Sequence, residues 1–260
     1  MSDLLQAAWL GVIEGVTEFL PISSTGHLLI AEHWLGERSE LFNVAIQSGA
    51  ILAAVLVFWP RIKTLLFGLN ERSNRDYLAK LTVAFLITAV GGLIAKKLGV
   101  GLPTTIAPVA GALIVGGVIM LLVEWLLKDR AAVAEATWSV AFWVGACQIL
   151  AAVFPGTSRS AATIFAAMLA GMTSRPAATE FAFLVGIPTM FAATAFEFLK
   201  ARGAAPIHEN WSALAVAFVV SGVVAFIAVR WLLRYLQTHR FTVFAWYRIV
   251  AGIALLAIVH

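Results

Sequence analysis

The chain has 260 residues, of which 61% are hydrophobic and only 12% are charged. Soluble domains carry about 25% charged residues, so this composition excludes an ordinary soluble protein and predicts an all-α integral membrane protein. The formal charge of +4 could indicate a nucleic acid partner, but the basic residues lie between apolar segments. They fit cytoplasmic loops under the positive-inside rule better, so we expect no nucleic acid partner. The length leaves no room for a sizeable soluble domain, and residues 1–260 are predicted to form a single membrane domain.

The first apolar segment, residues 4–20, is short for a full span of about 20 residues. Pro21 ends it, because proline supplies no N–H donor and its ring clashes with the preceding turn. A second short apolar helix is expected at 26–35. Non-helical backbone at membrane depth must be buried in protein or line a wet cavity. The pattern therefore predicts a re-entrant hairpin at 4–35.

Six further apolar segments are predicted to span the membrane. They lie at 41–59, 81–95, 106–127, 181–198, 212–229 and 243–259. Residues 61–80 are rich in Lys and Arg and are expected to form a polar loop. Residues 36–40, 96–103 and 199–211 are expected to connect spans on the opposite side. The short pattern recurs at 138–154 and 161–172 on either side of a polar break, which predicts a second re-entrant hairpin at 138–172.

The two breaks can be aligned with each other. Pro21 comes seven residues after Glu14, and Pro155 comes seven residues after Gln148. The residues after each proline then align as sets, Ser23-Ser24-Thr25 with Thr157-Ser158-Arg159. This similarity predicts an internal repeat of residues 1–127 and 128–260.

The distribution of basic residues predicts the orientation of the two repeats. If both breaks are hairpins, the repeats run in opposite directions. The connections on one side then carry eleven Lys and Arg residues, and those on the other side carry five. The positive-inside rule places the richer side in the cytoplasm. The predicted fold is an inverted-topology repeat with six spanning helices and two re-entrant hairpins that meet near the midplane.

The first break contains two acidic residues. Ionisable groups at membrane depth cost roughly 2.5–3.5 kcal/mol each on insertion scales, so they are candidates for function. Glu14 and Glu18 are four residues apart and share one face of a helix. They could hold a divalent cation, or one could act as a base. The alternative is a pair of carboxylates on a wet rim near the N-terminus.

Ser23, Ser24, Thr25, Gly26 and His27 follow at the start of the next helix. Hydroxyl residues at this place act as N-caps as readily as they act in catalysis. A helix N-terminus also presents free N–H groups to an anion. The histidine could take a proton from a serine or bind a phosphate oxygen, although a lone histidine is also common as a structural residue.

The second break supplies a permanent cation, Arg159, whose planar guanidinium matches phosphate oxygens. Thr157, Ser158 and Ser160 surround it in sequence, and the backbone of Gly156 could approach a ligand closely. The alternative for the arginine is a structural ion pair with one of the acidic residues.

These groups together predict chemistry at a phosphorus centre. A carboxylate pair, a serine, a histidine and an arginine suit attack by a hydroxyl while positive charge stabilises the phosphate oxygens. Gln47, in the first predicted span, either lines the same cavity or braces the hairpins. A lipid with a phosphate or pyrophosphate head is the expected substrate. A transporter or flippase is the alternative, because paired broken helices at the midplane are typical of transporters.

The motifs Glu14–His27 and Pro155–Ser160 resemble the two signatures of the undecaprenyl pyrophosphate phosphatases, also called bacitracin-resistance proteins. The resemblance covers essentially the whole chain, including the stretches 42–50 and 180–188. It implies hydrolysis of undecaprenyl pyrophosphate to the monophosphate and phosphate, which recycles the lipid carrier for peptidoglycan synthesis. It also implies a divalent cation, Mg²⁺ or Ca²⁺. The implied location is the bacterial inner membrane, with the site open to the periplasmic face; a homodimer is left open.

The resemblance also implies roles for single residues. Glu14 and Glu18 match the acidic pair linked to metal and catalysis, Ser24 the proposed nucleophile, His27 the catalytic histidine, and Arg159 the pyrophosphate-binding arginine. Candidates for substrate contact are Ser23, Thr25, Gly26, Gly156, Thr157, Ser158, Ser160 and Gln47. One departure is Ala161, where the family often has glycine.

Overall fold

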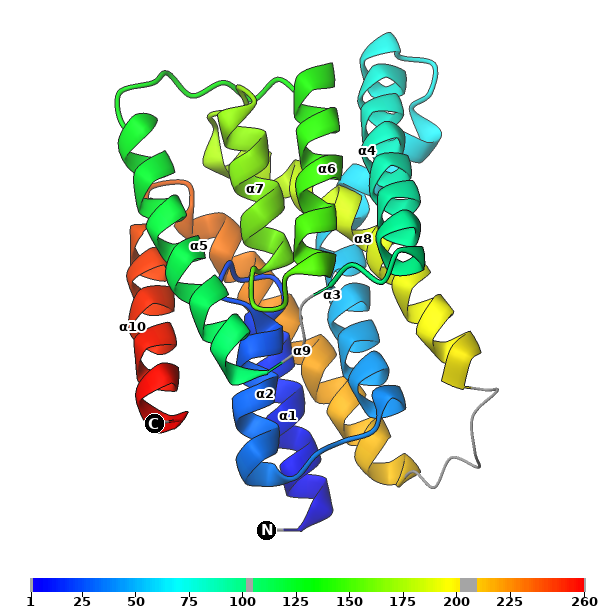
Figure 1. Cartoon of the computed structure of the whole chain (residues 1–260). Coiled ribbons are helices and arrows are strands. Elements are labelled where there is room, and N and C mark those ends of the chain that lie inside the picture. Colours follow the sequence, from blue (N-terminus) through cyan, green and yellow to red (C-terminus); the bar gives the residue numbers. More distant parts are fainter. Residues whose placement is uncertain (1, 102–104, 202–209, 260) are drawn as a thin grey trace.

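The computed structural model describes residues 2–101, 105–201 and 210–259. Within these residues the chain forms ten helices and no strand (Figure 1), which confirms the predicted all-α class. The helices are α1 (Asp3–Thr17), α2 (Ser24–Leu35), α3 (Glu40–Phe67), α4 (Arg72–Lys97), α5 (Ile106–Leu126), α6 (Trp138–Val153), α7 (Arg159–Leu169), α8 (Arg175–Ala201), α9 (Trp211–Tyr235) and α10 (Thr242–Val259). Parts of the predicted connections 96–103 and 199–211 lie outside the described residues.

Five helices, α3, α4, α5, α8 and α9, are long and apolar enough to cross a membrane. The apolar helices α6, α7 and α10 are shorter, and α10 is the segment predicted as the sixth span. A chain with five such helices is a multi-pass membrane protein. The two predicted short pairs are present, since α1 and α2 are separated at 18–23, and α6 and α7 at 154–158.

The polar loop predicted at 61–80 is wrong. Helix α3 continues to its end at residue 67, and only residues 68–71 connect it to α4. Two of the basic side chains of this stretch form ion pairs across or along helices and so do not require a loop. Arg61 lies 3.1 Å from Glu180 on α8, and Lys80 pairs with the aspartate one turn before it.

The short helices α1 and α6 each pack against a long helix of the other half of the chain. Helix α1 packs on α9, and α6 packs on α4. A Cβ atom at Gly11 would lie 2.6 Å from the carbonyl oxygen of Ala217, and one at Gly145 would lie 2.6 Å from that of Ala84. Only glycine allows helices to approach this closely. The two contacts are equivalent in kind, because each brings a half-length helix against the backbone of its partner.

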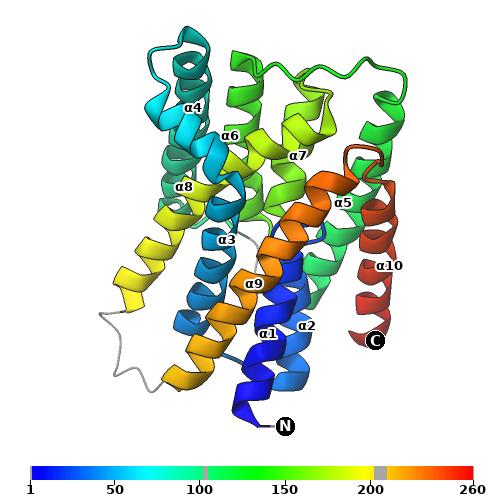
Figure 2. The same ribbon diagram turned by 180° about the vertical axis from the view of Figure 1, so that it is seen from behind.

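The two broken helix pairs enter the molecule from opposite ends. In Figures 1 and 2 the N-terminus and the α2–α3 connection lie at one end, and the α3–α4 turn and the 127–137 connection lie at the other. The breaks lie between these ends, next to α3 and α8, which pack on each other. Apolar residues close the core around them, for example Phe19 beside the ring of Phe183 at 5.1 Å.

Candidate active site

Each broken helix restarts at a serine with an unusual backbone conformation. Ser23 (φ 75°) and Ser158 (φ 67°) are the only non-glycine residues with positive φ in the described part of the chain. They are the N-caps of α2 and α7, and their side-chain oxygens accept the N–H groups of Gly26 and Ala161, respectively. Such conformations cost of order 1–3 kcal/mol, persist only where the surroundings fix them, and cluster at functional sites.

The cap serines correct the predicted alignment of the two breaks by one residue. Ser23 corresponds to Ser158, so the second break is one residue longer than the first. The additional residue is accommodated at Gly156, which has a positive φ of 89°. A Cβ atom at this position would lie 2.7 Å from the carbonyl oxygen of Val109. Ser24 therefore corresponds to Arg159. The pairing of the segments before the breaks is supported by the equivalent glycine contacts of α1 and α6.

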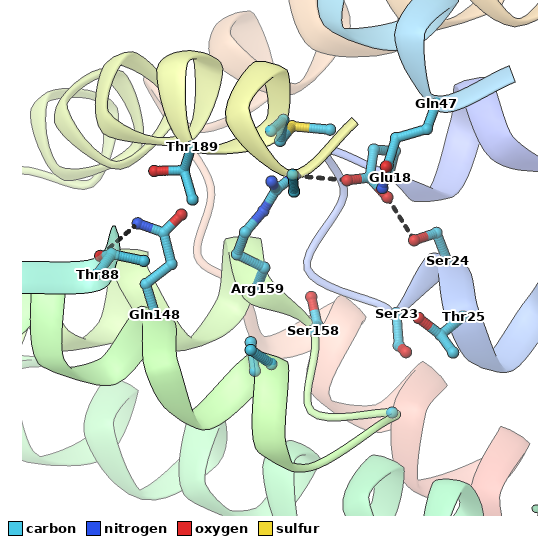
Figure 3. A pocket seen from close by; sticks show the side chains of 15 residues that line it. Glu18, Ser23, Ser24, Thr25, Gln47, Thr88, Gln148, Ser158, Arg159 and Thr189 are labelled. Carbon is cyan, nitrogen blue, oxygen red and sulfur yellow. Dashed lines mark hydrogen bonds and ion pairs between the residues drawn. The ribbon is translucent and has the colours of Figure 1, made fainter. Parts of the chain in front are cut away.

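The two breaks enclose a cavity of about 240 Å³ together with α3, α4, α6 and α8 (Figure 3). Its lining residues are mostly polar or small: Glu18, Ser23, Ser24, Thr25, Gln47, Thr88, Gln148, Ala151, Ala152, Gly156, Ser158, Arg159, Thr189, Met190 and Ala193. Eight of the thirteen predicted site residues are in this list. Gln47 lines the cavity from α3, which was one of the two roles predicted for it; the other was to brace the hairpins.

Glu18 lines this cavity and joins the two breaks. One carboxylate oxygen accepts the hydroxyl hydrogen of Ser24, and the other accepts an N–H of Arg159 (Figure 3). The Glu18 side chain is 6% exposed, and that of Arg159 is 21% exposed. A buried carboxylate that holds a serine hydroxyl is placed to take its proton. The guanidinium has five N–H donors, so a nitrogen bonded to Glu18 leaves others for an anion.

Glu14 lies one turn before Glu18 and is 2% exposed. Its Oε2 atom is buried and has no hydrogen-bond partner among the described residues. No group of three or more His, Cys, Asp or Glu residues that could hold a metal is present in the described part of the chain. Mg²⁺ sites for phosphate chemistry, however, commonly use one or two carboxylates and complete the shell with substrate oxygens and water. The orphaned oxygen and the pair of carboxylates fit a site of that kind.

His27 does not line the cavity and does not contact Ser24. Its Nδ1 atom lies 2.7 Å from the carbonyl oxygen of Ser23, and its Nε2 atom lies 2.6 Å from the hydroxyl of Tyr247 on α10. Because a carbonyl only accepts, Nδ1 carries a hydrogen. In the neutral ring, Nε2 accepts from the tyrosine, and the two rings stack at 5.6 Å. The histidine thus holds the backbone of the cap serine.

A model of the family described as bacitracin resistance protein BacA matches residues 7–254. This chain belongs to the BacA family. It is 60% identical over 255 residues to the undecaprenyl-diphosphatase of Rhizobium etli (strain CIAT 652), with 98% of this chain and 96% of the relative covered. It is 59% identical over 260 residues to the undecaprenyl-diphosphatase of Stenotrophomonas maltophilia (strain K279a), with 98% and 97% covered. The resemblance inferred from the two motifs is confirmed.

Three further predicted residues of this BacA-family site hold the two breaks in position and do not line the cavity. The Ser160 hydroxyl donates to the carbonyl oxygen of Leu20 at 3.1 Å, which ties the second break to the first. Gly26 is buried, and a Cβ atom there would lie 3.2 Å from the side chain of Val109. The carbonyl oxygen of Thr157 accepts a hydrogen bond from an arginine that was not among the predicted site residues.

That arginine is Arg248 on α10, which is fully buried. It donates to five backbone carbonyls and has no carboxylate partner among the described residues. The acceptors lie on both breaks and on α5: Pro21 (3.2 Å), Gly156 (3.2 Å), Thr157 (3.0 Å), Ala112 (3.0 Å) and Leu113 (3.3 Å). Carbonyls at a broken helix lack intrahelical donors, so one side chain satisfies both breaks at once. The signal in the sequence was an arginine within the apolar segment 243–259.

Proposed function

We propose that this protein hydrolyses undecaprenyl diphosphate to undecaprenyl phosphate and inorganic phosphate. The observation that carries the proposal is the contact of Glu18 with both Ser24 and Arg159 inside one cavity. This arrangement places a nucleophile, its base and an oxyanion-binding cation together, and phosphoryl transfer needs these groups. The relatives named undecaprenyl-diphosphatase, which match nearly the whole chain, supply the substrate. Release of the carrier lipid for cell-wall synthesis follows, and with it resistance to bacitracin.

In the proposed mechanism, Arg159 holds the oxygens of the terminal phosphate. Glu18 takes the proton of Ser24, and the serine oxygen attacks the terminal phosphorus. The bond to the bridging oxygen breaks, and that oxygen keeps the electron pair, takes the proton from Glu18 and leaves as part of undecaprenyl phosphate. Water then attacks the phosphoserine, and Ser24 Oγ recovers a proton. Direct attack by water on the substrate is the other route, in which Ser24 only orients Glu18. Full turnover by a Ser24→Ala variant would eliminate the covalent route.

We propose that Glu14 and Glu18 also hold a divalent cation, Mg²⁺ or Ca²⁺, when substrate is bound. Such an ion supplies positive charge that polarises the phosphoryl oxygens. The partnerless oxygen of Glu14 supports this assignment, because a buried acceptor without a donor is costly unless a ligand satisfies it. Ser23, Thr25 and Ser158 line the same cavity, and we propose that their hydroxyl or backbone groups contact the pyrophosphate.

We also propose that residues 1–127 and 128–260 form an inverted repeat in the bacterial inner membrane. The hairpins 4–35 and 138–172 would be re-entrant, and the site would open to the periplasmic face. The matched packing of α1 on α9 and of α6 on α4 supports the repeat. The excess of Lys and Arg on the opposite side supports this orientation.

The test is phosphate release from undecaprenyl diphosphate by protein purified in detergent. Wild type, Arg159→Ala and Arg159→Lys are compared, each with magnesium, with calcium and with EDTA. We expect metal-dependent release by wild type, no detectable release by the alanine variant, and partial release by the lysine variant. No release by folded wild type under either metal would reject the proposal and favour transport through the same cavity.

A further inference from the structure

The cavity has a second polar region that the reaction described above does not use. Gln148, on α6, is 2% exposed and lines the cavity, yet its Oε1 atom has no hydrogen-bond partner among the described residues. Its Nε2 atom donates to Thr88 Oγ1 on α4 at 3.2 Å. In Figure 3 the amide nitrogen faces Thr88, and the oxygen is turned away from it.

The orientation of this amide follows from the hydrogen bonds of Thr88. The threonine hydroxyl lies 3.0 Å from the carbonyl oxygen of Ala84 and 2.9 Å from that of Gly145. Both are acceptors, so the single hydroxyl hydrogen is committed to them and Oγ1 only accepts from Gln148. A flipped amide would place oxygen against oxygen. Oε1 of Gln148 is therefore kept away from Thr88.

The neighbouring hydroxyl group in the cavity is also an acceptor. Thr189 donates its hydrogen to the carbonyl oxygen of Val185 at 2.9 Å, which leaves lone pairs on Oγ1. We call Thr88, Gln148 and Thr189 the neutral arm of the cavity. Its oxygens would repel an unprotonated phosphate oxygen and would bind a hydrogen-bond donor. A cation is a poorer occupant, because no carboxylate belongs to this arm and the Arg159 guanidinium shares the cavity.

We propose that Gln148 Oε1 binds and orients the water molecule that hydrolyses the phosphoryl group. The inference rests on the proposed function, because water is the second substrate of that reaction. The amide accepts one hydrogen of the water and directs a lone pair of its oxygen toward phosphorus, as glutamine does in nucleotide hydrolysis. Gln148 neither gives nor takes a proton.

The step balances in either route. The water oxygen bonds to phosphorus, and Glu18 takes the proton that water loses. In the covalent route the bond from phosphorus to Ser24 Oγ breaks, and Glu18 returns the proton to that oxygen. In the direct route the bond to the bridging oxygen breaks, and that oxygen keeps the electron pair, takes the proton from Glu18 and leaves as part of undecaprenyl phosphate.

The experiment compares wild type with Gln148→Met, which keeps the side-chain length without the acceptor, and with Thr88→Val, which keeps the amide without its orienting partner. Thr88→Ser is the matched control, because it retains the hydroxyl. Phosphate release from undecaprenyl diphosphate is measured with and without methanol as a competing nucleophile. Methyl phosphate and inorganic phosphate are quantified in the same reaction.

We expect kcat to fall about five- to tenfold in Gln148→Met and Thr88→Val, the size of one hydrogen bond, with KM unchanged. The ratio of methyl phosphate to phosphate should rise several-fold in both variants and stay at the wild-type value in Thr88→Ser. A lower kcat with an unchanged ratio would show a merely structural role and overturn the inference. Unchanged rates and ratios would also overturn it, as would recovery of Gln148→Met at raised magnesium, which would assign the arm to a cation. Absence of phosphate release by wild type would instead reject the proposed function.

Discussion

The two breaks have the same construction and carry different chemistry. Each ends a half-length helix, passes through a serine with positive φ, and starts a new helix at that cap. The residues directly after the caps, Ser24 and Arg159, both donate to Glu18, one to each carboxylate oxygen. A repeated backbone therefore brings a nucleophile and a cation to one base from opposite sides.

The carboxylates are where the two breaks differ most. Glu18 lies four residues after Glu14, and Ala152 lies four residues after Gln148 at the matching place of the second half. An acidic pair in one half thus corresponds to an amide and a methyl group in the other, and all except Glu14 line the cavity. One base with one cation binds an anion, whereas two carboxylate pairs would repel it. Catalysis requires this difference between otherwise similar halves.

The largest effect is expected from removal of the shared base. Glu18→Gln leaves the side chain its shape but takes away the proton acceptor for Ser24 and the charge that Arg159 faces. Phosphate release should fall by about 10³-fold, within the range for loss of a general base. Glu180→Gln is the matched control, because Glu180 pairs with Arg61 outside the cavity. A rate for Glu18→Gln within tenfold of wild type would show that both breaks work without a common base.

The next effect concerns the side chain that holds the two breaks together. Arg248→Met would leave the carbonyls of Pro21, Gly156 and Thr157 at the breaks without this donor, whereas the two carbonyls on α5 keep their intrahelical N–H partners. Buried acceptors without partners cost roughly 1–3 kcal/mol each, with partial relief by relaxation or water. We expect the free energy of unfolding to fall by about 3 kcal/mol or more, together with activity.

Thermal unfolding in detergent, compared with Arg248→Lys, measures this loss. Lysine keeps a charge and up to three donors and should recover part of the stability. Equal loss in both variants would show that the fork geometry of arginine, and not the number of donors, decides. No loss in either would contradict the structural role.

A smaller effect should follow from making the two halves alike. Ala152→Glu would add a carboxylate at the place that matches Glu18 and would compete for Arg159. KM should rise by roughly tenfold, since a charged hydrogen bond to the phosphate is weakened. Ala152→Gln fills the same volume without the charge and separates crowding from electrostatics. If both variants raise KM equally, the alanine is required for space, and competition of a second carboxylate for Arg159 is not the cause.

The positions of the two breaks could be predicted from the sequence, whereas their exact correspondence and several of their contacts could not. Prolines at 21 and 155 interrupt apolar segments, and this signal located both breaks correctly. The one-residue difference between the breaks was missed, because the alignment assumed equal length and Gly156 absorbs the extra residue through its positive φ. Arg248 was visible only as an arginine within an apolar segment, and its role could not be predicted, because its partners are backbone carbonyls and these carry no signature in the sequence. The partner of His27 is Tyr247, 220 residues away, so spacing could not reveal it.

The smallest effect tests whether the backbone of the two breaks is equivalent. Ser→Ala at position 23 or 158 removes the cap hydrogen bond and keeps the strain of positive φ, so each should cost about 1 kcal/mol. Ser→Gly also removes the cap, but glycine adopts positive φ freely, and the two effects should offset to within about 0.5 kcal/mol. Chemical denaturation of the four variants in detergent measures these differences. Equal costs at both positions would show that the two breaks have the same backbone conformation and differ only in their side chains. A cost at one position alone would show that the serine at the other position is not needed as a cap, so that the two breaks are not equivalent.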